Sequence, residues 1–295
     1  MNTESLVNQK IALLGGDARE IELISILLDQ GAVLQTIGQP PGIDSESIEV
    51  VASLEGIDDD VIAVIAPMTG TDEKLQVKKT FVDKEVILTE DFFSRLKAGT
   101  KFFIGFAQPE IKDWSQKYRI ELTELAALDE VAILNAIPTA EGAIELAMSE
   151  MPITLHSNNS FVLGLGRVGF SLARMLKGMG SKVYGVARKH KDFARALDMG
   201  FEQVAFKDLE QEISKADFIF NTVPVLILDE ELLQHVKKDA IIIDLASYPG
   251  GTDFEAAKRL GLKAELALGL PGKVAPKSAG QILGKVIPRI ILNEG

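Results

Sequence analysis

Three glycines with the spacing G-x-G-x-x-G constrain the fold of this chain more than any other feature. Gly164, Gly166 and Gly169 follow a short apolar run and open an amphipathic stretch. In that setting the first glycine permits a tight turn, the second lets the backbone approach a pyrophosphate, and the third lets the helix pack on the strand. The free N–H groups at the start of such a helix favour an anion. The segment therefore predicts a dinucleotide-binding unit.

Around this segment, short β-branched runs alternate with longer amphipathic runs, which is typical of an α/β fold with parallel sheets. The second half predicts a doubly wound dinucleotide-binding sheet with right-handed crossovers. Its strands are expected at Phe161–Leu163, Lys182–Val186, Gln203–Ala205, Phe218–Asn221, Ile241–Asp244 and Lys263–Leu266. Its helices are expected at Arg167–Met179, Phe193–Asp198, Leu209–Lys215, Glu230–Val236 and Phe254–Arg259.

The first half predicts a second layer of the Rossmann-like or flavodoxin-like kind. Its strands are expected at Lys10–Leu14, Val33–Ile37, Val61–Ile65, Val86–Leu88 and Phe102–Ile104, and its helices at Glu20–Gln30, Asp91–Lys97 and Pro109–Tyr118. A connecting helix is expected to start at Thr139, behind Pro138, and to end near Met151. We therefore predict two domains, 1–150 and 151–295. A last helix, Ser278–Leu292, is placed so that it can fold back on the first domain.

The composition excludes several classes of function. The formal net charge of -12 over 295 residues argues against nucleic-acid or anionic-membrane partners. The chain has no cysteine, which excludes disulfides, zinc–thiolate sites and thiol nucleophiles. Its three histidines, His156, His190 and His235, make no readable triad or metal cluster, so no metal is expected. We find no signal peptide pattern and no apolar run near the about 20 residues of a membrane span, so we expect a cytoplasmic protein.

The end of the second strand in the dinucleotide unit indicates which nucleotide it holds. An NAD site usually has an acidic residue there, which accepts hydrogen bonds from the ribose. This chain has Ala187, Arg188 and Lys189 instead, and it has eight Lys or Arg against one Asp between Ser160 and Arg195. Arginine pairs with a 2′-phosphate in a bidentate manner. A solvated basic face is the alternative, but the placement favours NADP over NAD.

The ends of the later strands complete the predicted cofactor site, because ligands of this fold bind at the carboxyl ends of strands. The segment "FIFNTVP" ends one strand near the expected nicotinamide ribose, and "DLASYPGGTDF" ends the next near the nicotinamide. Ordinary strand-end turns are the alternative. The predicted cofactor-binding residues are Gly164, Gly166, Arg167, Val168, Gly169, Ala187, Arg188, Lys189, Asn221, Thr222, Val223, Pro224, Ala246 and Ser247.

Two further stretches contain candidate polar groups. The first, "LLGGDARE", follows a strand and opens a helix. It either holds an anion through its backbone N–H groups and Arg19, or it caps the helix with Asp17. The second, "LGLPGKVAPKSAGQIL", carries Lys273, Lys277 and Ser278. It is either a loop that closes over the nicotinamide or a connector to the last helix.

Six segments, in their order along the chain, carry a family resemblance: "GGDAREIEL", "NAIPTAEGAIELAM", "VLGLGRVG", "FNTVP", "DLASYPGGTDF" and "GLPGKVAPKSAGQI". With them the chain resembles, over essentially its whole length, the family of dipicolinate synthase A subunits from spore-forming bacteria. Each segment is modest, but the ordered set is specific. "PTAEG" and "GLPGKVAP" are also similar to adenosylhomocysteinase, alanine dehydrogenase and methylenetetrahydrofolate dehydrogenase, which bears on fold and cofactor only.

The resemblance implies NAD(P)-dependent oxidation of dihydrodipicolinate, or of its hydrated precursor, to dipicolinate. It also implies a flavoprotein-like partner, the dipicolinate synthase B subunit, and the cytoplasm of the mother cell during sporulation; we expect a homo-oligomer. Because the product ring is aromatic, the protein must mainly position a small dicarboxylate substrate. Substrate-binding candidates are Arg19, Thr139, Arg167, Lys273, Lys277 and Ser278; catalytic candidates are Asp17, Arg19, Glu141 and Lys277. Asp17, Glu141 or water is expected to take the released proton.

Three other functions fit parts of the sequence. A 2-hydroxyacid dehydrogenase would need a histidine after the last strand, and Leu268–Leu283 has none. A methylenetetrahydrofolate dehydrogenase would need a Tyr-x-x-x-Lys pair, but Leu122 stands four residues after Tyr118. A regulatory subunit that binds NADP without turnover is the alternative that is not an enzyme, and an assay for turnover distinguishes it.

Overall fold

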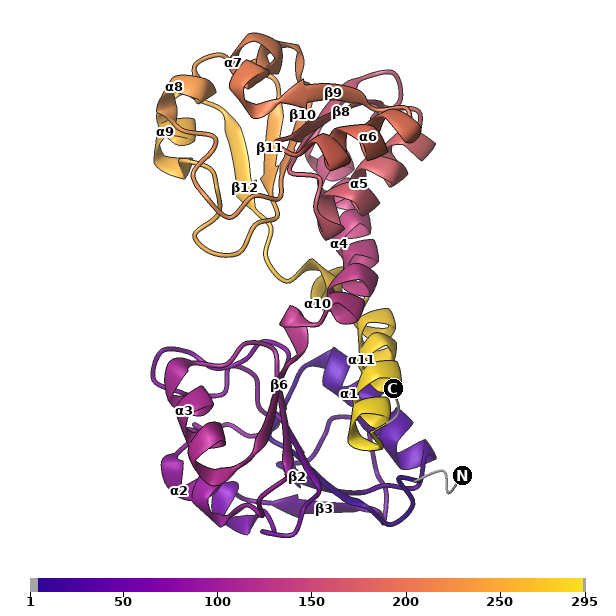
Figure 1. Ribbon diagram of the computed structural model, residues 1–295, viewed down its shortest axis with the longest axis vertical. Coiled ribbons are helices and arrows are strands. Elements are labelled where there is room, and N and C mark those ends of the chain that lie inside the picture. The colour runs from indigo at the N-terminus through magenta and orange to yellow at the C-terminus, as the bar shows by residue number, and fades with distance from the viewer. Residues whose placement is uncertain (1–4, 294–295) are drawn as a thin grey trace. The chain divides into compact units, whose positions relative to one another are not determined.

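The computed structural model describes residues 5–293, and the chain divides into two compact units. Unit 1 is Met1–Ala132 together with Ala275–Gly295, and unit 2 is Ile133–Val274 (Figure 1). We expected one boundary, at residues 150 and 151. The chain instead enters unit 2 at Ile133, because the second half of the connecting helix packs into the core of unit 2. It returns to unit 1 at Ala275, because the last helix packs into the core of unit 1.

Unit 1 contains a six-stranded parallel sheet in the order β3-β2-β1-β4-β5-β6. Its strands are β1 (Lys10–Leu13), β2 (Val33–Ile37), β3 (Ile48–Val51), β4 (Ala63–Ile65), β5 (Lys101–Ile104) and β6 (Glu121–Glu124). The central strand β1 is buried on both faces, since Ile11 and Leu13 join one core cluster and Ala12 joins another. The predicted Rossmann-like layer is therefore confirmed.

Two features of this sheet differ from the prediction. The predicted strand at Val86–Leu88 is wrong: Ile87 makes only an isolated bridge to Gln76, while Val86 and Leu88 are buried in the core. Their apolar pattern reflects a loop packed on the sheet. The edge strands β3 and β6 were not predicted, because their side chains are exposed or half-buried and acidic residues interrupt the apolar pattern: Glu49 in β3, and Glu121 and Glu124 in β6.

The helices of unit 1 are α1 (Ala18–Asp29), α2 (Glu90–Arg95), α3 (Pro109–Tyr118) and α11 (Pro276–Ile291), with single turns η1 (Leu54–Gly56) and η2 (Leu125–Ala127). Helix α3 has the predicted bounds and begins with proline at N1, where the missing N–H has no helical partner to lose. Helix α2 begins after Thr89, whose hydroxyl accepts a hydrogen bond from the Phe92 N–H at 3.3 Å.

Helix α11 packs closely against α1, from which it is far removed in sequence (Figure 1). Gly280 lies against Arg19 and Glu22, and Gly284 lies against Ile26. The contacts advance along both helices together, so α1 and α11 run in the same direction and their first turns lie side by side. The apolar side of α11 completes one of the two cores of unit 1.

Unit 2 contains a second six-stranded parallel sheet, in the order β12-β11-β10-β7-β8-β9. Its strands are β7 (Asn159–Leu163), β8 (Lys182–Ala187), β9 (Glu202–Ala205), β10 (Phe218–Asn221), β11 (Ile241–Asp244) and β12 (Lys263–Leu266). Each matches a predicted strand to within two residues at either end. Along β7, Phe161 and Leu163 join one core cluster and Val162 joins the other, as expected of a strand covered on both faces.

The helices of unit 2 are α5 (Arg167–Gly178), α6 (His190–Asp198), α7 (Leu209–Glu212), α8 (Glu230–Leu233), α9 (Phe254–Arg259) and α10 (Leu270–Val274), with turns η3 (Phe206–Asp208) and η4 (Ile213–Lys215). The segment Leu268–Leu283, left open between a loop and a connector, is largely helical. It contains α10 and the first half of α11.

The connecting helix α4 (Asp129–Glu150) begins ten residues before the predicted start at Thr139. We expected Pro138 to precede the helix, but it lies inside. The helix continues because residues on both sides of the proline, such as Val131 and Ala143, are fully buried. This packing outweighs the loss of one helical hydrogen bond at the proline. By length and composition α4 also resembles a membrane span, but 44% of its apolar window is buried, as in the core helix of a globular protein.

The substitution Gly280→Ala tests the contact between α1 and α11. A Cβ at this position would lie 2.5 Å from the Arg19 carbonyl oxygen, which is backbone and cannot rotate away. We expect the substitution to lower the free energy of unfolding by about 1–3 kcal/mol, as overpacking does. Urea denaturation followed by circular dichroism measures the change. Gly284→Ala is the matched control, since its new methyl group would meet only the flexible Ile26 side chain. An equal loss of stability in both variants would contradict the close approach of Gly280 to the Arg19 backbone.

Candidate functional site

The glycine fingerprint forms a closely packed turn between β7 and α5. Gly164 has φ of +88°, a backbone conformation that favours glycine. A Cβ at Gly169 would collide with the Gly164 carbonyl oxygen, so the third glycine lets α5 approach β7. The Thr222 hydroxyl donates to the carbonyls of Leu163 at 2.9 Å and Gly164 at 3.0 Å, and thereby ties the end of β10 to this turn.

The first turn of α5 has the features of a pyrophosphate site. Gly166 is the N-cap of α5, and no side chain of the described residues caps this helix. Asp or Thr side chains cap α1, α2, α8 and α9, whereas α3, α6, α7 and α11 also lack a side-chain cap within residues 5–293. A Cβ at Gly166 would meet no atom within 4 Å, so the space in front of this glycine is open. The uncapped N–H groups and the helix dipole fit a bound anion. Arg167 and Val168 belong to the same turn.

The basic end of β8 lies next to this turn. Val186 pairs with Leu163 in the sheet, and its carbonyl accepts a hydrogen bond from the Gly164 N–H at 2.9 Å. Ala187 is buried, while Arg188 and Lys189 are exposed. The Arg188 guanidinium carbon lies 5.7 Å from the centre of the Phe206 ring. This cation–π contact holds a guanidinium at the strand end where the sequence lacks an acidic residue.

The ends of β10 and β11 form the other half of this edge. Asn221 pairs with both Leu163 and Asp244 in the sheet, so the four strand ends β8, β7, β10 and β11 stand in a row. Asn221 is fully buried, and its amide bonds to the backbone of Val223 and to Asp244. Thr222 and Val223 are half-buried, Pro224 and Ser247 are exposed, and Ala246 is buried. The structure therefore brings the predicted cofactor residues to one edge of the sheet.

In unit 1, the "GGDARE" segment forms a buried charge cluster at the start of α1. Asp17 is the N-cap of α1 in a capping box with Glu20. The Arg19 guanidinium donates from Nε and Nη2 to the two carboxylate oxygens of Asp17, at 2.9 and 2.8 Å. Glu20 is 1% exposed and accepts hydrogen bonds from the N–H groups of Asp17 and Met68, both at 2.8 Å. Of the two alternatives for Asp17, the structure shows the helix cap.

The pKa values of the two carboxyl groups of this cluster are shifted in opposite directions from their usual values. Burial opposes ionisation of Asp17, but hydrogen bonds from the side chain and backbone of Arg19 outweigh it and hold the pKa of Asp17 below its usual value. Burial raises the pKa of Glu20, and the Arg19 charge and the Met68 N–H offset that only in part. Asp17 is consequently the ionised partner of Arg19.

The other substrate and catalytic candidates divide between the two units. In unit 1, Lys277 and Ser278 are exposed in the first turn of α11, beside the first turn of α1 that carries Arg19. In unit 2, the Thr139 hydroxyl donates to the Asn135 carbonyl at 2.7 Å, and Glu141 is exposed on α4. The remaining two candidates of unit 2 are also exposed: Arg167 on α5 and Lys273 on α10. Their roles stay predictions.

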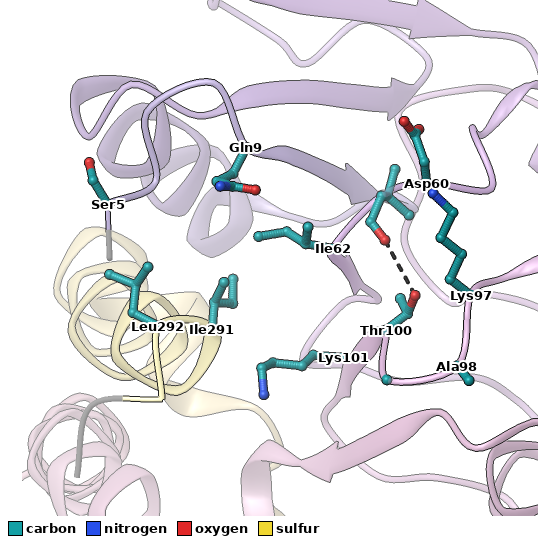
Figure 2. Close-up of a pocket in the computed structure, with 12 residues that line it drawn as sticks. Ser5, Gln9, Asp60, Ile62, Lys97, Ala98, Thr100, Lys101, Ile291 and Leu292 are labelled. Carbon is teal, nitrogen blue, oxygen red and sulfur yellow. Dashed lines mark hydrogen bonds between the residues drawn. The ribbon is translucent and has the colours of Figure 1, made fainter. Parts of the chain in front are cut away.

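A depression of about 540 Å³ lies at the opposite edge of the unit 1 sheet (Figure 2). Gln9, Ile62 and Lys101, at the amino ends of β1, β4 and β5, line it. The Thr100 hydroxyl donates to the Val61 carbonyl at 3.3 Å. The Lys101 ammonium lies 2.7 Å from the carboxylate of Glu121, which is outside the lining. This edge carries the amino ends of the strands, whereas ligands of this fold bind at the carboxyl edge. We do not place the functional site here.

Sequence reasoning missed Asp244 and Glu20 as parts of the site. Asp244 is fully buried and accepts four hydrogen bonds at the end of β11. A sequence signal existed, because an acidic residue directly follows the apolar run "AIII". Glu20 occupies the N3 position of a capping box, which the spacing from Asp17 also indicates. Their burial depends on the loops that cover them and has no local sequence signal.

Comparisons with known proteins assign a family to each unit. Residues 10–126 match the family described as the N-terminal domain of the dipicolinate synthase A subunit. Residues 138–247 match the family described as D-isomer specific 2-hydroxyacid dehydrogenase, NAD binding domain. Unit 2 therefore has an NAD-binding dehydrogenase domain, consistent with the open glycine turn and with a nicotinamide dinucleotide as cofactor. The match does not distinguish NADP from NAD.

Similarity to relatives extends over the whole chain. The dipicolinate synthase A subunit of Bacillus subtilis (strain 168) is 36% identical over 287 residues, which are 97% of each chain. The crystal structure of the dipicolinate synthase A subunit from Bacillus halodurans superposes with a TM-score of 0.93 at 35% identity, covering 98% of this chain and 99% of that one. The corresponding crystal structure from Bacillus subtilis also gives 0.93, at 34% identity and with 100% coverage of both chains.

The substitution Gly166→Ala separates dinucleotide binding from folding. The new methyl group fills the open space where a pyrophosphate would approach, so we expect at least about tenfold weaker binding of NADP⁺ by isothermal titration calorimetry. Stability should fall by less than about 1 kcal/mol, the usual difference between glycine and alanine at an N-cap. Gly178→Ala, at the other end of α5 and also in open space, is the control. Wild-type affinity in Gly166→Ala would contradict the site.

The pH dependence of Asp17→Asn tests the charge cluster. Asparagine keeps the cap but removes the ion pair, which should cost about 1–3 kcal/mol at neutral pH, between the values for exposed and buried pairs. Because the folded pKa of Asp17 is lowered, its stabilisation is present above the unfolded pKa of about 3.9 and disappears as pH falls through the folded pKa. Urea unfolding of both proteins across this range measures the difference.

The matched control for this titration is Asp113→Asn. Asp113 is exposed on α3 and makes no ion pair among the described residues. Its substitution should leave stability at neutral pH near that of the wild type. A difference between wild type and Asp17→Asn that persists undiminished in acid would show that Asp17 is not the stabilising carboxylate.

Proposed function

Because this chain belongs to the family of dipicolinate synthase A subunits, we propose that it oxidises dihydrodipicolinate, or its hydrated precursor, to dipicolinate. The observation that carries the proposal is the pairing, in one chain, of a unit matched to this family and a unit with an open dinucleotide turn. The dehydrogenase-type domain supports an oxidoreductase. Bound nicotinamide supplies a hydride acceptor.

Oxidation of a dihydropyridine ring removes one hydride and one proton and leaves an aromatic pyridine. The chain must therefore orient the ring, hold two carboxylates and accept a proton. We propose that Asp17, Glu141 or water takes the proton. Asp17 is ionised, although the hydrogen bonds from Arg19 that lower its pKa also make it a weaker proton acceptor, and Glu141 is exposed on α4.

Three cationic or hydroxyl groups in unit 1 support recognition of a carboxylate there. Lys277 and Ser278 lie in the first turn of α11, which begins after Ala275 without a side-chain cap from the described residues. An uncapped helix start with a lysine and a serine suits a carboxylate. Arg19 is held in a fork by Asp17, so its contact with substrate would use Nη1 or exchange that ion pair. Thr139, Arg167 and Lys273 are the corresponding candidates of unit 2.

We also propose NADP as the preferred nucleotide. Arg188 and Lys189 support it, because they supply positive charge at the strand end where an NAD site would have an acid. The family name implies a second subunit, and we propose that it is the dipicolinate synthase B subunit. A homo-oligomeric assembly and the mother-cell cytoplasm of a sporulating bacterium complete the proposal.

Turnover is tested by mixing the protein with dihydrodipicolinate and NADP⁺ or NAD⁺, with and without the B subunit. We expect NADPH absorbance and pyridine absorbance to rise together. Arg19→Ala and Lys277→Ala should each lower kcat/KM by about tenfold or more, as loss of a charged contact to a carboxylate does. If both variants kept wild-type turnover and substrate affinity, the substrate assignment would be wrong.

Lys285→Ala is the matched control for these variants, since Lys285 lies on the exposed side of α11, away from its first turn. If the protein bound the dinucleotide but gave no turnover either with or without the B subunit, it would be a regulatory protein instead. In a binding titration, Arg188→Ala should lose more affinity for NADP⁺ than for NAD⁺. Tighter binding of NAD⁺ than of NADP⁺ by the wild type would contradict the nucleotide preference.

A further inference from the structure

A fully buried carboxylate connects the two strand ends at the predicted nicotinamide side of unit 2. Asp244 is 0% exposed, and each of its oxygens accepts two hydrogen bonds. Oδ1 accepts from the Asn221 amide and the Ala246 N–H, both at 3.0 Å. Oδ2 accepts from the Gly251 N–H at 2.8 Å and the Thr252 hydroxyl at 2.7 Å. Four neutral donors thus replace water around a buried acid.

These bonds close residues 245–252 into a loop and join it to the end of β10, and backbone hydrogen bonds join the loop to the segment that follows β10. The Gly251 carbonyl accepts from the N–H groups of Ile227 and Leu228, both at 2.9 Å, and the Leu228 carbonyl accepts from the Asp253 N–H. A Cβ at Gly251 would collide with the Val223 carbonyl, so the two segments are in direct contact. Asp244 bonds to the loop directly and to the Asn221 amide, which also donates to the Val223 carbonyl at 3.1 Å.

The position of this loop relates it to one half of a dinucleotide. Asn221 is the register neighbour of both Leu163 and Asp244, and Thr222 bonds to the glycine turn. In this fold the pyrophosphate lies at the glycine turn, and the adenosine ribose lies at the end of the next strand, here β8. The nicotinamide half therefore extends to the opposite side, over the ends of β10 and β11, where the loop stands.

We propose that Asp244 is a positioning residue, which holds the 245–252 loop in the shape that receives the nicotinamide half of the cofactor. It does not touch the cofactor, since it is fully buried; it acts through Ala246, Gly251 and Thr252. This inference rests on dinucleotide binding by unit 2, as in the proposed function. A loop held in its bound shape costs less to order on binding, so losing that support weakens only the half of the ligand that contacts the loop.

The test compares a whole dinucleotide with its adenine half. Calorimetry would measure NADP⁺ and adenosine 2′,5′-bisphosphate binding to the wild type and to Asp244→Asn. Asparagine presents the N–H donors of its amide where one carboxylate oxygen accepted two hydrogen bonds, so we expect NADP⁺ affinity to fall by about tenfold or more. Affinity for the bisphosphate should not change. Equal losses for both ligands, or no loss for either, would overturn the proposal.

Asp217→Asn is the matched control. Asp217 precedes the other end of β10, and its carboxylate accepts from the Asn159 N–H at 2.8 Å and the Lys237 ammonium at 2.6 Å. Its substitution changes a hydrogen-bond acceptor at the amino edge of the sheet. The ratio of NADP⁺ affinity to adenosine 2′,5′-bisphosphate affinity should therefore stay at its wild-type value. A fall in that ratio equal to the fall in Asp244→Asn would show a general loss of structure and overturn the proposal.

A milder pair of variants keeps the proposal falsifiable if Asp244→Asn does not fold. Thr252→Val removes one donor and leaves the carboxylate, and Thr252→Ser restores the hydroxyl. We expect Thr252→Val to weaken NADP⁺ but not the bisphosphate, and Thr252→Ser to recover wild-type affinity. No selective loss in Thr252→Val would count against the proposal. If the wild type bound neither ligand, the proposed function itself would fail, which separates the two outcomes.

Discussion

A parallel sheet places the carboxyl ends of all its strands at one edge, and the chemistry of both units depends on this constraint. In unit 2 it brings the glycine turn, Arg188, Asn221 and Asp244 into one row, although they lie far apart in the sequence. In unit 1 it places the Asp17 cluster after β1 and Met68 after β4, so that Glu20 can bond to both. The row in unit 2 exists in no local segment of the chain, whereas the Asp17 cluster is local except for the Met68 N–H.

The two clusters satisfy buried carboxylates in different ways. Asp17 is paired with the Arg19 cation, and burial raises the pKa of Glu20 beside it. Asp244 has four neutral donors, two from the backbone and two from side chains. The Arg19 fork is bidentate and directional, but it fixes two side chains within the first turn of α1. A shell of hydrogen bonds requires each donor in its place, so it specifies the shape of a loop more strictly.

The sequence predicted the fold of unit 2 better than that of unit 1, for a physical reason. The four inner strands of unit 2 are largely buried, and such apolar runs are readable. In unit 1 the edge strands β3 and β6 have half-buried or exposed side chains, and the apolar residues of Val86–Leu88 belong to a loop. Pro138 led to a predicted start of α4 ten residues too late, because tertiary packing outweighs the local effect of the proline. The glycine turn was readable because its spacing is local, whereas the Asp17–Arg19 fork depends on side-chain conformations.

Unit 1 is discontinuous, since residues 275–293 return to it after the whole of unit 2. Its core contains Leu283, Ile287 and Ile291 of α11 together with Leu23 and Leu27 of α1. During synthesis, unit 2 is a continuous stretch that can fold as soon as it is made. One side of α1 stays uncovered until α11 has been made. The order of synthesis therefore lets unit 2 fold before this core of unit 1 is closed.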